Sequence, residues 1–141
     1  MVVRLLKLAL MYLMLGVAMG VAMGVSHRFE YAPVHAHVNL LGWVSLGMFA
    51  LIYHAHPEAA RTRLACWHFW LHNIGLPVFM VSLFLERSGV EGAEAFVRIG
   101  AGVTFVGVVL FGFNLLRAFA AASRPVLEPL ERREFKGSER S

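Results

Sequence analysis

Two histidines, His35 and His37, are two residues apart at the start of an apolar stretch that continues to Tyr53. Placing an ionisable side chain inside a membrane-spanning helix costs free energy, so such residues mark a functional site by default. Two positions correspond to about 200° of rotation around an α-helix, so the two rings project from opposite flanks. A neutral imidazole that ligates haem iron or another transition metal no longer carries this cost. One helix can therefore serve two ligand sites.

The other five histidines fall into two groups. His68 and His72 are four residues apart and share one helix face, an arrangement that can chelate a metal ion. For His72, axial ligation, a hydrogen bond to a haem edge and a bridge to another helix stay open. For His27, His54 and His56, a hydrogen bond to a neighbouring helix or an interfacial position is the simpler interpretation.

The composition predicts an integral membrane protein with an all-α fold. Of the 141 residues, 58% are hydrophobic, and the mean hydropathy is +0.64. Four apolar stretches approach the length of about 20 residues that a transmembrane helix needs. They are Leu5 to Val25, Val34 to His54, Leu64 to Leu85, and Ile99 to Ala122. We expect residues 1–123 to form one four-helix transmembrane bundle and residues 124–141 to form a polar cytoplasmic tail.

The distribution of positive charge predicts the orientation. With the N-terminus in the cytoplasm, only Arg28, Arg87 and Arg98 of the thirteen Lys and Arg lie outside. The expected location is a bacterial-type inner membrane, crossed several times with both termini cytoplasmic. The net charge of +4 is then a topology signal and predicts no nucleic-acid partner.

The first apolar stretch repeats glycine every four residues, at Gly16, Gly20 and Gly24. Such a stripe allows another helix to approach closely, and packing within the chain is favoured over packing between subunits. Four methionines on the same stretch raise the alternative of soft-metal transport, although methionine is also a common gap-filling residue. They are Met11, Met14, Met19 and Met23.

Two motifs resemble the catalytic subunit of haem-copper oxidases. The stretch from His35 through Gly42 to Met48 is similar to the haem-ligating tenth helix, most closely to the H-x-H-x-x-x-x-G form found in nitric oxide reductases. The stretch Phe69 to Leu76 is similar to the F-W-x-x-N-x-G-L segment of the next helix in those reductases. The two motifs stand in the same order in consecutive helices.

This resemblance implies that His35 binds a high-spin haem and His37 a low-spin haem, both haem b and near the outer face. Arg28 or Arg98 is then placed to meet a haem propionate. The sequence has no counterpart of the family's copper or iron ligands on earlier helices, and none of its second-helix histidine. The resemblance therefore leaves an enzymatic activity open, and it implies electron transfer or the binding of a diatomic gas such as NO or O2.

Assembly can supply a missing ligand. The family's catalytic subunit is a ring of three four-helix arcs, so three copies of this chain can build a comparable ring in which His37 of one copy and His35 of the next hold one haem. A dimer with one shared haem and an intrachain pair of His27 and His37 stay open. Membrane lipid and a redox partner or gas ligand are the other expected partners. The alternatives to haem are a membrane protein that handles copper or another metal and a structural assembly partner of an oxidase.

Overall fold

The computed structural model describes residues 1–123, which fold into helices joined by short connections. The expected tail, 124–141, lies outside the described residues. In chain order the helices are α1 (Val2–Ser26), the 3-10 helix η1 (Phe29–Tyr31), α2 (Ala32–His37), the π-helix η2 (Val38–Val44), α3 (Ser45–Ala55), α4 (Pro57–Ala60), α5 (Arg63–Arg87) and α6 (Ala93–Ala122). The all-α fold expected from the sequence is confirmed for this part of the chain.

Four helices are long and apolar enough to cross a membrane, as the sequence predicts: Val2–Ser26, Phe29–Ala55, Arg63–Arg87 and Ala93–Ala122. The last one begins earlier than the expected Ile99. Glu94 and Arg98 are too polar for an apolar stretch, but they are good helix formers. Gly92, with a φ of 78°, closes the preceding turn and lets α6 begin at Ala93.

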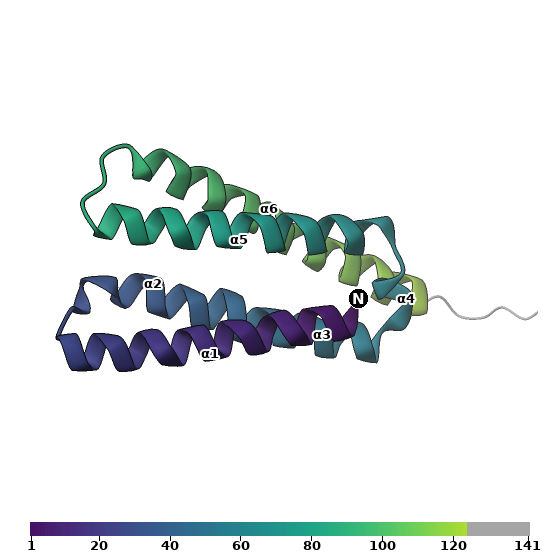
Figure 1. Cartoon of the computed structure of the whole chain (residues 1–141). Coiled ribbons are helices and arrows are strands. Elements are labelled where there is room, and N and C mark those ends of the chain that lie inside the picture. The colour runs from purple at the N-terminus through teal and green to yellow at the C-terminus, as the bar shows by residue number, and fades with distance from the viewer. Residues whose placement is uncertain (124–141) are drawn as a thin grey trace, which may run out of the picture.

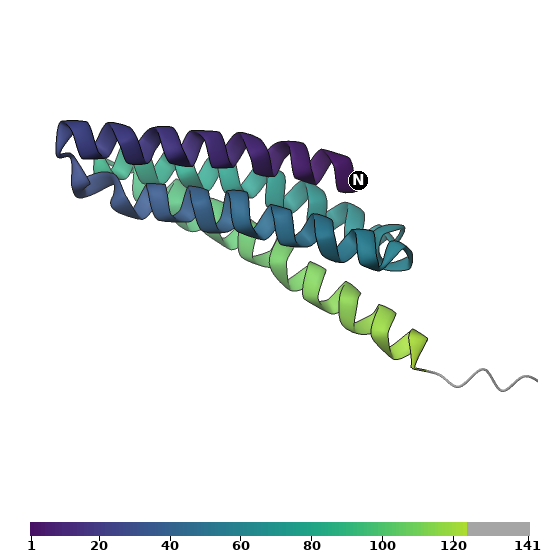
Figure 2. The same ribbon diagram turned by 90° about the horizontal axis from the view of Figure 1, so that it is seen from below.

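The helices form two hairpins that converge at one end. α1 lies along the second span, α5 lies along α6, and α4 joins the two hairpins at the end that also holds the first residue (Figure 1). α6 diverges from the other helices toward its C-terminal end (Figure 2). Both ends of the described chain therefore lie at the same end of the bundle.

The second span is not one regular α-helix. After His37 the backbone widens into the π-helical segment η2, and the Ser45 side chain donates a hydrogen bond to the Leu40 carbonyl at 2.8 Å. A wider turn changes which carbonyl groups are free to accept bonds from other helices. The apolar stretch from Val34 to His54 predicts one regular α-helix, and this prediction is wrong at Val38–Val44.

Glycines bring α1 close to the second span. A Cβ on Gly16 would overlap the Asn39 side chain, and one on Gly20 would lie 3.0 Å from the His35 ring. Gly42 in turn accommodates the Tyr12 ring. Packing within the chain is thus confirmed for Gly16 and Gly20, while Gly24 has open space around it.

At the converging end, hydrogen bonds tie three helices together. Thr62 caps α5 by accepting a bond from the Ala65 backbone N–H at 3.0 Å. The Thr62 hydroxyl donates to the Asn114 side chain at 2.7 Å, and Asn114 donates to the Ala59 carbonyl at 2.8 Å. α5 continues through Pro77 as a single helix.

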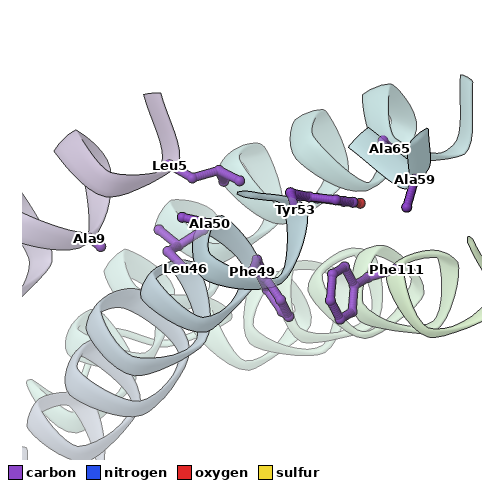
Figure 3. Close-up of a cluster of buried hydrophobic side chains, with 9 residues drawn as sticks. All are labelled: Leu5, Ala9, Leu46, Phe49, Ala50, Tyr53, Ala59, Ala65 and Phe111. Carbon is purple, nitrogen blue, oxygen red and sulfur yellow. The ribbon is translucent and has the colours of Figure 1, made fainter. Parts of the chain in front are cut away.

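Two apolar clusters hold the hairpins together. The larger one, at the converging end, joins residues of α1, α3, α4, α5 and α6 (Figure 3): Leu5, Ala9, Leu46, Phe49, Ala50, Tyr53, Ala59, Ala65 and Phe111. The second packs the start of the second span against α5 and contains Val34, Val38, Leu76, Met80 and Leu83. The two clusters fix where the histidines of the second span and of α5 lie.

Candidate functional site

His37 is the histidine best prepared to act as a ligand. It is the last residue of α2 and is partly buried, and its Nδ1 lies 2.7 Å from the Pro33 carbonyl. Because a carbonyl can only accept, Nδ1 carries the proton and Nε2 keeps its lone pair. Nε2 has no hydrogen bond to any residue between 1 and 123. A histidine held by its other ring nitrogen is the usual form of a metal-ligating imidazole.

His35 lies on the opposite flank of α2, as the two-residue spacing predicts. Its partly buried ring packs over Gly20 of α1, whereas the His37 ring packs edge-on against Phe79 of α5 with centroids 5.2 Å apart. Asn39 donates to the His35 backbone carbonyl at 2.8 Å, and its side-chain nitrogen is 3.4 Å from His35 Nδ1. This contact favours a lone pair on Nδ1, so His35 is less well prepared to ligate through Nε2.

His27 and Arg28 occupy the exposed turn between α1 and η1. His27 adopts the left-handed conformation with a φ of 55° and ends α1. Arg28 donates to the Glu30 carboxylate at 2.7 Å and to the Tyr31 hydroxyl at 2.8 Å. The bond to Glu30 raises the pKa of the Arg28 guanidinium above its ordinary value. Arg28 is thus charged but already engaged within the chain.

His68 and His72 lie in the protein interior. Both are fully buried on α5, their ring centroids are 5.9 Å apart, and the Phe49 ring meets both edge-on. His72 Nε2 donates to the Leu41 carbonyl at 3.1 Å. Of the roles considered for His72, the structure therefore shows a hydrogen bond that bridges α5 to the second span. His68 Nδ1 shares a hydrogen bond of 3.1 Å with the Tyr53 hydroxyl. His68 Nε2 and His72 Nδ1 have no partner in the described chain.

The candidate ligands do not converge on one centre. Among residues 1–123, no three His, Cys, Asp or Glu side chains lie close enough together to hold a metal ion. His35 faces α1, His37 faces α5, and the pair His68 and His72 lies in the core. The methionines of α1 do not share one environment either. Met11 and Met14 are exposed, whereas Met19 packs against the second apolar cluster.

Two partners of the buried histidines escaped the sequence analysis. Tyr53 was considered only as the end of an apolar stretch, yet its hydroxyl bonds to His68 fifteen residues away. The Leu41 carbonyl accepts from His72 within the π-helical segment. A tyrosine at the C-terminal end of one apolar stretch, with a histidine near the start of the next, was a usable signal in the sequence. A backbone acceptor such as the Leu41 carbonyl leaves no such signal.

Replacing Tyr53 with Phe should destabilise the bundle. The change removes the only bond to His68 Nδ1 within the described chain and leaves both ring nitrogens of a fully buried histidine without a partner. We expect a loss of about 1–3 kcal/mol in the free energy of unfolding, measured by titration with SDS. Tyr12→Phe is the control, since the Tyr12 hydroxyl has no bond to residues 1–123. Equal loss in both variants would contradict the role of the bond.

Comparison with known proteins gives a weak similarity to an oxidase subunit. The chain is 28% identical over 127 residues to the CcoN1 subunit of the cbb3-type cytochrome c oxidase of Stutzerimonas stutzeri. The match covers 69% of this chain and 27% of that subunit, so the chain spans about a quarter of the length of the relative. No family model matches the chain, and no solved structure matches it. The similarity suggests a haem-copper oxidase-like relationship and agrees with a multi-pass membrane protein.

Proposed function

We propose that this protein binds haem b through the second span and serves as an electron carrier or as a binder of a diatomic gas. The observation that carries the proposal is the state of His37, whose Nδ1 is held by the Pro33 carbonyl at 2.7 Å while Nε2 keeps a free lone pair. The similarity to a cytochrome c oxidase subunit supports haem over other metals.

The residues around His37 fit an axial ligand of haem iron. Its imidazole is oriented by a hydrogen bond within its own helix, and Phe79 packs on the ring edge-on. A haem with two histidine ligands supplies one-electron transfer, and one with a single histidine keeps a position open for gas. Asn39 contributes by positioning His35, to which it is bonded.

We propose that the haem lies between copies of the chain. His35 and His37 occupy opposite flanks of the span, so the two cannot ligate the same iron from one copy. The described cavities of 350–480 Å³ are lined by other residues. A closed trimer supplies His37 from one copy and His35 from the next, and a dimer with a shared haem is the other arrangement.

The decisive experiment is an absorption spectrum of the purified full chain, oxidised, reduced, and reduced in the presence of CO. A low-spin b-type spectrum without a CO shift supports electron transfer between two histidine ligands, whereas a CO shift supports an open site. Purification without haem after expression with a haem supply overturns the proposal. Copper retained in its place supports metal handling.

A further inference from the structure

A second feature, unrelated to the histidines, is a basic cavity at the converging end of the bundle. The cavity has a volume of about 410 Å³ and lies between α1, the turn after α4, and the start of α5. Its lining includes Arg4, Arg61, Thr62, Cys66, Phe69 and Trp70. Two like charges in one cavity repel each other unless an anion lies between them.

Neither arginine has a carboxylate partner in the described chain. The ion pairs among residues 1–123 join Arg28 to Glu30 and His56 to Glu58, and the Arg4 and Arg61 side chains are absent from both. Glu58, the carboxylate at this end in residues 1–123, lines a different cavity together with Arg63 and Arg117. Within residues 1–123, Arg4 and Arg61 are therefore exposed cations that no carboxylate engages, and an external anion can bind them.

The cavity also lies at the boundary of the candidate spans, which begin at Val2 and Arg63. Trp67 and Trp70 are 61% and 53% exposed there, as expected of tryptophans at a membrane interface. From Cys66 an exposed stripe continues along one face of α5 at four-residue spacing, through Trp70, Ile74 and Val78. A basic pocket at headgroup depth thus leads directly into an apolar track.

We propose that this cavity binds the phosphate of an anionic phospholipid, with Arg4 and Arg61 as its ligands and an acyl chain along the stripe from Cys66 to Val78. Arginine pairs well with phosphate because its fork of N–H donors matches two oxygens. Basic pockets between transmembrane helices are typical sites for acidic headgroups. The apolar track distinguishes a phospholipid from a free phosphate.

The test counts lipids bound to the full chain by native mass spectrometry in neutral detergent. Dioleoylphosphatidylglycerol is titrated against dioleoylphosphatidylcholine on the wild type and on the double variant Arg4→Gln/Arg61→Gln. We expect the wild type to prefer the anionic lipid and the variant to bind it about tenfold more weakly. The matched control is Arg63→Gln/Arg117→Gln, which removes the same charge from a different cavity at the same end of the bundle and should leave binding unchanged.

Two further measurements keep the proposal falsifiable if the double variant does not fold. On the wild type, high salt should weaken binding of the anionic lipid, and glycerol 3-phosphate at equal concentration should not displace it. Equal binding of the two lipids, equal loss in the control variant, or displacement by glycerol 3-phosphate would each overturn the proposed site. The haem spectrum should not change in the double variant, so this proposal and the haem proposal fail separately.

Discussion

Replacing His37 with Gly should remove the haem from the purified protein. The variant loses the imidazole whose Nδ1 is fixed by Pro33 and whose Nε2 is free to ligate iron. Since disruption of a partner that only orients a ligand already costs about 10–100-fold in metal affinity, we expect loss of the ligand itself to lower the haem content at least tenfold. The measurement is the ratio of haem to protein from the pyridine haemochrome spectrum.

The His37 prediction has a matched control and a rescue. His54→Gly removes an exposed histidine of α3 on the same span, so it should retain the wild-type haem content. Free imidazole added to His37→Gly should restore a low-spin spectrum, because the molecule fills the space that the side chain vacates. A His37→Gly protein that keeps its haem while His35→Gly loses it would reverse our assignment of the better prepared ligand.

The sequence predicted the spans well because each is a long apolar stretch bounded by polar residues. Hydropathy alone located all four spans. The two-residue spacing of His35 and His37 correctly predicted that their rings lie on opposite flanks of the helix. The π-helical turn at Val38–Val44 was missed because its hydrogen bonds join backbone groups five residues apart, and backbone bonds leave no mark on the residue types of the sequence. For the same reason the sequence could not choose the Leu41 carbonyl as the partner of His72.

The candidate site was harder to predict than the fold. The residue types identified the histidines as candidates, but only the structure distinguishes His37, which is bonded to Pro33, from His35, which Asn39 contacts. Burial likewise separates His68 and His72 from the partly buried pair on the second span. The ring nitrogen that carries the proton in His35 and His37 is set by a neighbour one helical turn away. The burial of His68 and His72 depends instead on how the two hairpins pack together, which the sequence does not reveal.

Replacing Gly100 with Ala should destabilise the bundle strongly. A Cβ at this position of α6 would lie 2.5 Å from the backbone nitrogen of Phe79 and 2.7 Å from its Cα. These are backbone atoms of α5, so they cannot rotate away as a flexible side chain does, and the two helices must separate. We expect a loss of about 2–3 kcal/mol in the free energy of unfolding, measured by SDS titration with circular dichroism.

The control for Gly100→Ala lies two residues along the same helix. Gly102 has no atom within 4 Å of its ideal Cβ, so Gly102→Ala should be neutral or stabilising by at most about 1 kcal/mol through its greater helix propensity. Equal destabilisation by the two variants would contradict close packing of α5 on α6. Phe79 also packs against the His37 ring at 5.2 Å, so we expect Gly100→Ala to lower the haem content as well, though less than His37→Gly does. The close packing of α6 on α5 would then support the His37 ring through Phe79.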